Sequence, residues 1–196
     1  MDRQSESQKL DKKGLTEAQA IAAYQKKNYP KPALTADIVV TGKKDKDTTV
    51  LLIRRGGHPY LGCWALPGGF ANANECVEET AARELAEETG VSGLQMKPVG
   101  LFSRPGRDPR GWVVSQAYTA FVDPHLLKPV AGDDADQVAW FSICLADDRL
   151  TLSHGGVRIE IGYQYRDGRL YTRALSEEKL AFDHGEILLR ALAVSQ

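Results

Sequence analysis

The chain has 196 residues, which is enough for one domain with additional segments and too few for two full domains. Its 25 basic and 26 acidic side chains give a net charge of −1, so no strongly basic face is expected and nucleic acid is not an expected partner. No apolar run is long enough for a membrane span and the polar start is unlike a signal peptide, so we expect no membrane association and a cytoplasmic location.

The cysteines and histidines indicate neither a disulfide framework nor a zinc site. The 3 cysteines are odd in number and widely spaced, which suits a reducing compartment, and the 4 histidines show no metal-ligand spacing. We expect each histidine to be a non-ligand and each cysteine to be a small buried apolar side chain. The cysteines are Cys63, Cys76 and Cys144.

The first part of the chain predicts a disordered tail, a short helix and three strands. Residues 1–14 are polar and charged and are expected to be disordered, whereas 15–196 should form a single domain. Thr16 can cap a short helix, which the prolines near residue 30 end. Strands are predicted at 34–40 and 48–54, and a short buried strand at 63–66.

Residues 69–91 contain fixed spacings between particular residues, and an ordinary surface helix does not require such spacings. Five residues separate Gly69 from Glu75, and seven separate Glu75 from Arg83. The later fixed positions are Glu84, Leu85, Glu87, Glu88, Gly90 and Val91. A chance match to these nine positions is on the order of one in 10^8. The pattern therefore favours a functional unit over a solvated acidic helix.

The spacing also has a chemical interpretation. Pro67 and the two glycines after it break a strand, Asn72 or Asn74 can cap the next helix, and Gly90 can end it. On that helix Glu84, Glu87 and Glu88 stand within a sector of about 100°. Such carboxylates repel each other unless a hard divalent cation, Mg²⁺ or Mn²⁺, neutralises them. Arg83 can pair with Glu79 and Glu87, which would hold the carboxylates in place.

The second half of the chain predicts a mixed set of strands and a closing helix. The loop at 103–111 between two of the strands contains three arginines, two prolines and two glycines. Asp183 and Glu186 resemble a capping box before the closing helix. The strands are expected at 95–102, 112–122 and 138–141. Strands interleaved with a few helices indicate an α/β fold with a mixed sheet between helices.

Residues 157–175 predict a β-hairpin about the two-residue turn Asp167-Gly168. Counting outward from the turn, Tyr165 faces Leu170. One face of the first strand is apolar and needs cover, because an isolated hairpin is marginal in water. Either the same domain or a second copy of the chain can supply that cover, and we expect a homodimer. The apolar positions are Val157, Ile159, Ile161, Tyr163 and Tyr165.

The nine fixed positions resemble the box of the Nudix hydrolases. This resemblance implies an α/β/α sandwich in which 15–196 form one Nudix domain with its box at 69–91. The hairpin at 151–178 would be an insertion. Further segments are similar to the branch that contains ADP-ribose pyrophosphatases and Nudix-fused regulators that sense ADP-ribose. These segments are 29–40, 107–110, 131–135 and 181–184.

Carried onto this sequence, the resemblance implies a metal site and a substrate loop. The implied ligands are Glu84, Glu87, Glu88 and the backbone carbonyl of Gly68, with Arg83 as a further catalytic residue. The loop at 104–110 would border the substrate, because arginine forks suit phosphate groups. Its candidate residues are Arg104, Arg107, Asp108 and Arg110, and weaker phosphate candidates are Arg54 and Arg55. The alternative for this loop is an ordinary solvated turn.

One position departs from the family pattern. Many Nudix proteins have a glutamate three residues before the tryptophan that matches Trp140, and here that position is Gln137, which cannot ionise. Asp133, Asp134 and Asp136 lie just upstream and could supply an extra ligand or a general base, or form only a charged turn. The general base is therefore either a box glutamate or one of these aspartates.

The expected function is that of a Mg²⁺- or Mn²⁺-dependent pyrophosphohydrolase of a nucleoside diphosphate linked to another group. The favoured reaction is the cleavage of ADP-ribose to AMP and ribose 5-phosphate. One alternative is another nucleotide sugar or a dinucleotide as substrate, since loops determine substrate choice. The other is a non-enzymatic ADP-ribose sensor. The regulators of this branch carry a C-terminal winged-helix domain, whereas this sequence ends soon after the closing helix with its box intact, which favours the enzyme.

Overall fold

The computed structural model describes residues 9–132 and 135–194, and the chain divides into two compact units, Met1–Lys31 and Pro32–Gln196. The first unit contains α2 (Glu17–Gln25), which begins at the predicted cap, Thr16. The Thr16 hydroxyl accepts a hydrogen bond from the Gln19 amide, and the Gln19 side chain accepts one from the Thr16 amide. The disorder expected for 1–14 stays a prediction.

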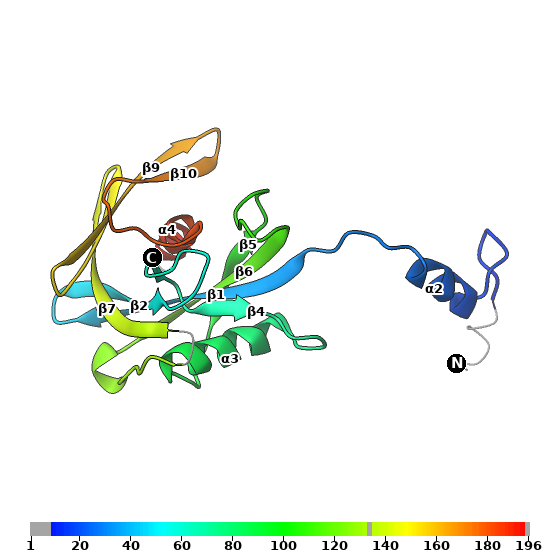
Figure 1. The fold of residues 1–196 in the computed structure, drawn as a ribbon, viewed down its shortest axis with the longest axis horizontal. Helices are drawn as coiled ribbons and strands as arrows, with labels where there is room; N and C mark the ends of the chain where they lie inside the picture. The colour runs from blue at the N-terminus through cyan, green and yellow to red at the C-terminus, as the bar shows by residue number, and fades with distance from the viewer. Residues whose placement is uncertain (1–8, 133–134, 195–196) are drawn as a thin grey trace. The chain divides into compact units, whose positions relative to one another are not determined.

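The second unit is built on one mixed sheet (Figure 1). Its strand order is β10-β9-β8-β7-β2-β1-β6-β5, with β3 beside β2 and β4 beside β1. β1 and β6 run parallel, whereas the other neighbouring strands are antiparallel. The strands are β1 (Ala33–Lys44), β2 (Asp47–Arg55), β3 (Trp64–Ala65), β4 (Gly68–Phe70), β5 (Lys97–Phe102), β6 (Val113–Val122), β7 (Ala135–Ala146), β8 (Arg149–His154), β9 (Val157–Arg166) and β10 (Arg169–Ala174).

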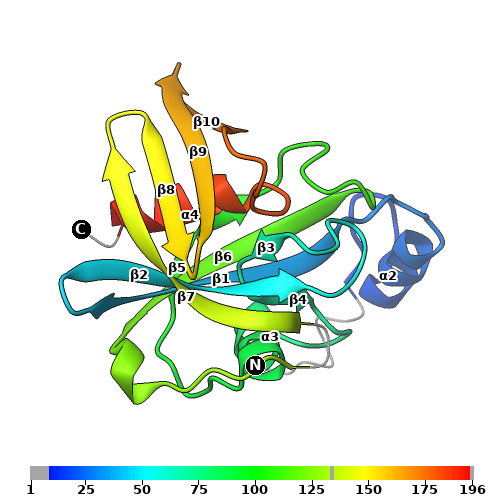
Figure 2. The ribbon, with the colours of Figure 1, turned by 60° about the vertical axis from the view of Figure 1, so that its left-hand side comes forward.

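Both faces of the central strands are buried, because a helix covers each face. Side chains alternate along β1, so that Ile38 packs with Leu85 of α3 (Val77–Thr89) and Val39 packs in the cluster of Ile187 from α4 (His184–Val194). Figure 2 shows α3 and α4 on opposite sides of the sheet. The predicted α/β/α sandwich with a mixed sheet is confirmed. None of the helices in the described part of the chain is long and apolar enough to cross a membrane.

The hairpin of β9 and β10 has the predicted turn and pairing, with Tyr165 opposite Leu170. The centre of its apolar face, however, packs within its own domain, whereas Tyr165 next to the turn is exposed. Ile159 is fully buried and Ile161 is 5% exposed, and both belong to the cluster that contains Ile187. The idea that these two isoleucines contact a second copy of the chain is therefore wrong, since no surface is left for it. A homodimer through another surface stays a prediction, as does the status of the hairpin as an insertion.

Several local expectations are corrected. Residues 149–154 form a strand, β8, that was not predicted, because it has only six residues between two polar turns. Cys76 and Cys144 are exposed and Cys63 is half-buried, so burial of all three cysteines was wrong. Cys76 is also the cap residue of α3, in place of Asn72 or Asn74. The helix begins later than expected because the Glu75 carboxylate accepts a hydrogen bond from the Asn72 amide and closes a turn first.

The burial of β9 predicts which of its apolar side chains stabilise the fold. We expect Ile159→Ala to lower the free energy of unfolding by about 2–5 kcal/mol, because it leaves a cavity beside α4. The matched control is Tyr165→Ala on the same strand, where the side chain is 63% exposed and the expected change is below about 1 kcal/mol. Urea unfolding measures both values. Equal effects of the two substitutions would contradict the placement of the hairpin.

Candidate functional site

The two glycines of β4 bring the backbone of the chain against the acidic side chains of α3. A Cβ atom at Gly69 would collide with the Glu84 carboxylate, and one at Gly68 would collide with the carbonyl oxygen of Ala36 on β1. The Gly68 amide donates a hydrogen bond to the Glu88 carboxylate at 2.8 Å. Glycine is required at position 68 because a side chain there would force β4 away from the backbone of β1, whereas a side chain at position 69 would displace the Glu84 carboxylate.

Arg83 holds three of the acidic side chains together. Its Nε donates to Glu75 at 2.8 Å, and its Nη1 donates to Glu84 at 2.7 Å and to Glu87 at 2.9 Å. The predicted pairing with Glu87 is therefore present. The predicted pairing with Glu79 is not, because the Glu79 carboxylate accepts a hydrogen bond from the Cys76 amide at the start of the helix.

The protein around α3 does not fully stabilise the charged forms of Glu84 and Glu88. Burial raises the pKa of Glu88 to about 8; the hydrogen bond from Gly68 opposes this rise and the charge of Glu84 adds to it. Burial also raises the pKa of Glu84, although Arg83 opposes it. A cation placed among these oxygens would stabilise the charged forms of both carboxylates.

The donor chemistry of this group fits a hard divalent ion such as Mg²⁺ or Mn²⁺, which prefers carboxylate and carbonyl oxygens. Glu84, Glu87 and Glu88 lie on one helix, and Glu84 and Glu88 reach toward the Gly68-Gly69 backbone. Among the residues described, no three acidic, histidine or cysteine side chains already form a ligand cluster. Arg83 and the Gly68 amide hold the carboxylates, so these side chains would need to turn toward an ion.

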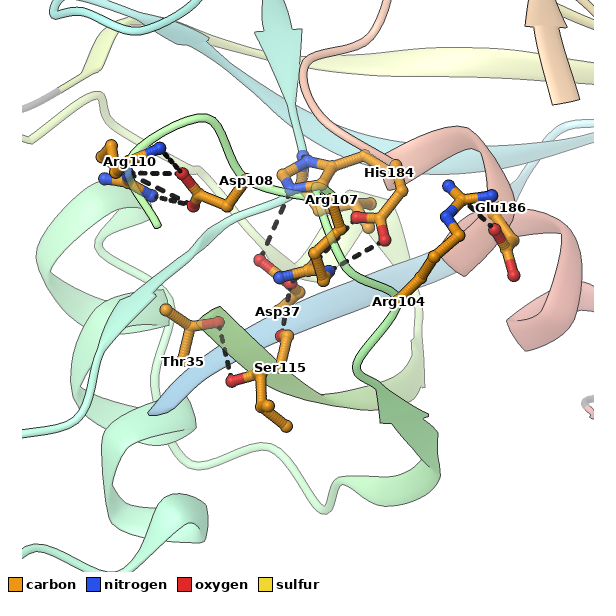
Figure 3. A network of polar contacts seen from close by, with 12 residues as sticks. Thr35, Asp37, Arg104, Arg107, Asp108, Arg110, Ser115, His184 and Glu186 are labelled. Atoms are coloured by element: carbon orange, nitrogen blue, oxygen red, sulfur yellow. Dashed lines mark hydrogen bonds and ion pairs between the residues drawn. The ribbon is translucent and has the colours of Figure 1, made fainter. Parts of the chain in front are cut away.

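A buried polar network lies beside this segment and connects four parts of the chain (Figure 3). Arg107 donates to both carboxylate oxygens of Asp183, through Nε at 2.8 Å and Nη2 at 2.6 Å. The same Nη2 lies 3.4 Å from Asp37 on β1. Asp37 also accepts a hydrogen bond from the Ser115 hydroxyl on β6 and lies 3.5 Å from Nε2 of His184 on α4. The network joins two neighbouring strands, the arginine loop and the start of the last helix.

His184 connects this network to the glycine segment. Its Nδ1 accepts a hydrogen bond from the Leu66 amide at 2.9 Å, although 118 residues separate the two positions. With Nδ1 as the acceptor, the proton of the neutral ring is on Nε2, the atom that faces Asp37. Complete burial lowers the pKa of His184, and the charges of Asp37 and Asp183 oppose this only in part. The histidine is therefore neutral at pH 7 and fixes the chain two residues before Gly68.

The arginine loop borders a cleft, but its residues differ in role from the expectation. The Arg107 side chain is 4% exposed and committed to Asp183, so it does not offer its fork to a substrate. Asp108 accepts three hydrogen bonds from the Arg110 side chain, and the exposed Arg104 lies 3.5 Å from Glu186. The cleft is lined by Thr35, Asp37, Arg55, Leu66, Gly68, Gly69, Phe70, Arg107, Asp108, Arg110, Phe182 and His184. Gly68 and Gly69 thus touch both the cleft and the carboxylates of α3.

The remaining candidates lie farther from this cleft or outside the described chain. Arg54 Nε donates to the Gly62 carbonyl and holds a loop, whereas the neighbouring Arg55 lines the cleft. Asp136 is exposed on β7 and is not among the described residues that line the cleft. Asp133 and Asp134 lie outside the described residues. The segment before them is fixed on α3, because a Cβ atom at Gly132 would collide with the carbonyl oxygen of Glu87.

Sequence reasoning missed Asp37, Ser115, His184 and the two cleft phenylalanines, Phe70 and Phe182. Asp37, Phe182 and His184 lie in the segments 29–40 and 181–184 that resemble the family branch, and Asp37 also left a signal of its own. Asp37 is a charged residue in the middle of an otherwise apolar strand, and a buried carboxylate needs partners. The partners themselves come from residues more than 60 positions away, and no local spacing identifies them.

Several known proteins are similar to this chain in sequence. The sequence model of the NUDIX domain family matches residues 31–157. An ADP-ribose pyrophosphatase from Methanocaldococcus jannaschii is 42% identical over 115 residues, which are 59% of this chain and 64% of that protein. The ADPR responsive transcriptional repressor NtrR from Acinetobacter baylyi is 35% identical over 105 residues, which are 53% of this chain and 42% of that protein. The chain thus spans less than two thirds of either relative.

Solved structures show the same architecture. A MutT/nudix family protein from Enterococcus faecalis matches with a TM-score of 0.80 and 37% identity over 99% of this chain and 74% of that one. The NUDIX domain of Shewanella oneidensis NrtR, solved as a complex with ADP ribose, matches with a TM-score of 0.70 and 29% identity over 93% of this chain and 100% of that one. Similarity therefore extends over nearly the whole chain.

The buried position of Arg107 predicts a structural effect on substitution. We expect Arg107→Leu to lower the free energy of unfolding by about 3–5 kcal/mol, because Asp183 and Asp37 would keep buried charges without their partner. The control is Arg104→Leu in the same loop, whose side chain is 56% exposed and whose loss should cost less than about 1 kcal/mol. Chemical denaturation distinguishes the two. Normal stability of Arg107→Leu would return this residue to the substrate-binding candidates.

The neutral His184 predicts a dependence of stability on pH. Its pKa in the folded protein is below the ordinary value of 6.5, so the unfolded chain takes up the proton first as the pH falls. His184→Asn keeps an oxygen that can accept from Leu66 but removes the titration. The stability of the wild type relative to this variant should fall below pH 6.5, by at most about 1.4 kcal/mol per pH unit. A constant difference between pH 7.5 and 5.5, measured by urea unfolding, would show that the buried ring does not titrate as described.

Proposed function

The chain belongs to the NUDIX family, and on that premise we propose that it is a metal-dependent pyrophosphohydrolase of nucleoside diphosphates linked to a second group. The observation that carries the proposal is the contact between the α3 carboxylates and the Gly68-Gly69 backbone at the edge of the cleft. A helix that served only the fold would not need half-buried and buried glutamates packed against the Gly68-Gly69 backbone.

The roles follow from the geometry. Glu84, Glu87, Glu88 and the Gly68 carbonyl would hold Mg²⁺ or Mn²⁺. When bound, such an ion polarises a phosphoryl oxygen and lowers the pKa of a water molecule. Arg83 orients Glu84 and Glu87 through one nitrogen, Nη1. In the reaction the water oxygen forms a bond to one phosphorus, the bridging P–O bond breaks, and the water proton passes to a general base. A box glutamate or one of Asp133, Asp134 and Asp136 serves as that base.

ADP-ribose is the proposed substrate, with AMP and ribose 5-phosphate as products. Two findings support it: the M. jannaschii relative bears the name ADP-ribose pyrophosphatase, and the S. oneidensis domain was solved with ADP ribose. Arg55 and Arg110 line the cleft beside the glycines, where guanidinium groups suit a pyrophosphate. A cytoplasmic location and a homodimer are further predictions of this proposal.

Two alternatives have specific support. Another nucleotide sugar or a dinucleotide would use the same carboxylates, because these would act only on the phosphates and the metal. A sensor that binds ADP-ribose without cleaving it is the second, since the A. baylyi relative is named as an ADPR responsive repressor. The complete set of acidic residues on α3 favours the enzyme.

A hydrolysis screen over nucleoside diphosphate derivatives with Mg²⁺ and with Mn²⁺ separates these possibilities. We expect higher kcat/KM for ADP-ribose than for any nucleoside triphosphate. A triphosphate as the better substrate would reject the substrate class, and tight ADP-ribose binding without turnover would establish the sensor.

The same screen tests the carboxylates. Glu84→Gln and Glu88→Gln keep side-chain shape but remove charge, so each should lose about a hundredfold or more in kcat, as when charge stabilisation of the transition state is removed. Glu78→Gln is the matched control, because Glu78 lies on the same helix but is exposed. Near-normal activity of either site variant would overturn the ligand assignment, and activity that is unaffected by chelation of divalent ions would reject the mechanism.

A further inference from the structure

A cluster of aromatic and cationic side chains forms one wall of the cleft. Phe70 follows Gly69 on β4, Phe182 lies just before α4, and Arg110 comes from the arginine loop. The guanidinium carbon of Arg110 lies 4.6 Å from the centre of the Phe70 ring and 5.3 Å from that of Phe182. Three segments that are distant in sequence thus bring two rings and a planar cation together.

Protein contacts hold each member of the cluster in place. The Arg110 fork is oriented by Asp108, whose side chain is only 3% exposed. The ring of Phe182 packs against Tyr60 at 4.7 Å between centroids, and the Arg55 guanidinium carbon lies 5.2 Å from its centre. Phe182 also has a φ of 49°, a conformation that is unfavourable for a phenylalanine and that functional sites often retain. The cluster is therefore built before any ligand arrives.

Packing alone does not explain this arrangement. Phe70 is 39% exposed, and the Arg110 side chain is also 39% exposed, whereas the core phenylalanine Phe141 is fully buried. A ring that is this exposed gains less from burial than a fully buried core ring does. Both rings instead line the cleft that Gly68 and Gly69 share with the α3 carboxylates.

We propose that Phe70, Arg110 and Phe182 form the stacking surface for the nucleobase of the substrate. The inference rests on the proposed function, which places the phosphates beside Gly68. Every nucleobase has a flat face that stacks on aromatic rings and on guanidinium groups. The base would stack on the rings of this wall, and the neighbouring phosphates would interact with its cationic charge.

The charge of the wall adds a preference between bases. Arg110 and Arg55 both place guanidinium groups against the aromatic rings. A neutral purine can stack here, whereas a positively charged ring such as oxidised nicotinamide would be repelled. The adenosine end of a substrate is therefore the end that this wall receives.

The test uses mononucleotides, which bind without being cleaved at a pyrophosphate. Calorimetric titration of the full chain with Mg²⁺ compares three ligands that share a ribose 5-phosphate: AMP, nicotinamide mononucleotide and ribose 5-phosphate itself. We expect AMP to bind about tenfold more tightly than ribose 5-phosphate, the range that one stacked base provides. Nicotinamide mononucleotide should bind no more tightly than ribose 5-phosphate. Equal affinities for AMP and ribose 5-phosphate would overturn the proposal, and so would equal affinities for the two mononucleotides.

Substitutions then assign the effect to the wall. Phe70→Leu and Phe182→Leu should each weaken AMP binding by about tenfold and leave ribose 5-phosphate binding unchanged. Phe70→Tyr keeps a ring and should retain the affinity. The control is Phe121→Leu on β6, where the ring is 66% exposed and does not line the cleft. If Phe182→Leu fails to fold, the exposed Phe70 still decides the question.

The outcomes separate the wall from the catalytic proposal. Loss of AMP affinity in Phe70→Leu supports the wall even if the wild type cleaves no pyrophosphate. Unchanged AMP affinity in a folded Phe70→Leu overturns the wall even if ADP-ribose is hydrolysed rapidly. A parallel loss of affinity for AMP and ribose 5-phosphate also overturns it, because the ring would then act on the phosphate and not on the base.

Discussion

The ion pair between Arg107 and Asp183 is the constraint on which the rest of the site depends. The pair buries two opposite charges, and Asp37 adds a third buried charge. Hydrogen bonds from Arg107 and Ser115 offset the cost of burying Asp37. Because Asp183 directly precedes α4, the pair fixes where that helix begins. His184 then follows in a position to accept from Leu66, which places the glycines. A loop, a helix start and a strand are thereby set relative to one another.

The acidic face of α3 differs from this network in the balance of its charges. In the network around Arg107, two carboxylates share one arginine and the Ser115 hydroxyl, whereas three glutamates contact the single arginine of α3. Burial raises the pKa of Glu88 to about 8, which marks a carboxylate that the protein alone does not stabilise as an anion. The network around Arg107 gives rigidity, and the acidic face of α3 leaves room for a ligand of opposite charge. The protein places the two side by side.

The sequence predicted the structure correctly where the deciding residues lie close together in the chain. The helix of the box and the turn at Asp167-Gly168 both follow from spacing within one element. It failed where the answer depends on a distant partner. Arginine is a residue type that often binds phosphate, but the partner of Arg107 is Asp183, which lies 76 residues away.

The neighbouring arginines show the same limit. Arg54 and Arg55 are equal candidates in the sequence, and only the fold shows that Arg55 faces the cleft. The apolar face of β9 could equally have been an interface, and the position of α4 decided that it is core.

The long separation between His184 and Leu66 has a consequence for synthesis. During translation the box helix and the glycines leave the ribosome well before residues 183 and 184 exist. Until then the Leu66 amide lacks its acceptor and Arg107 lacks its carboxylate partner. The nascent chain therefore carries the acidic residues without the fixed backbone beside them. The last helix must therefore emerge and dock before these two contacts can form.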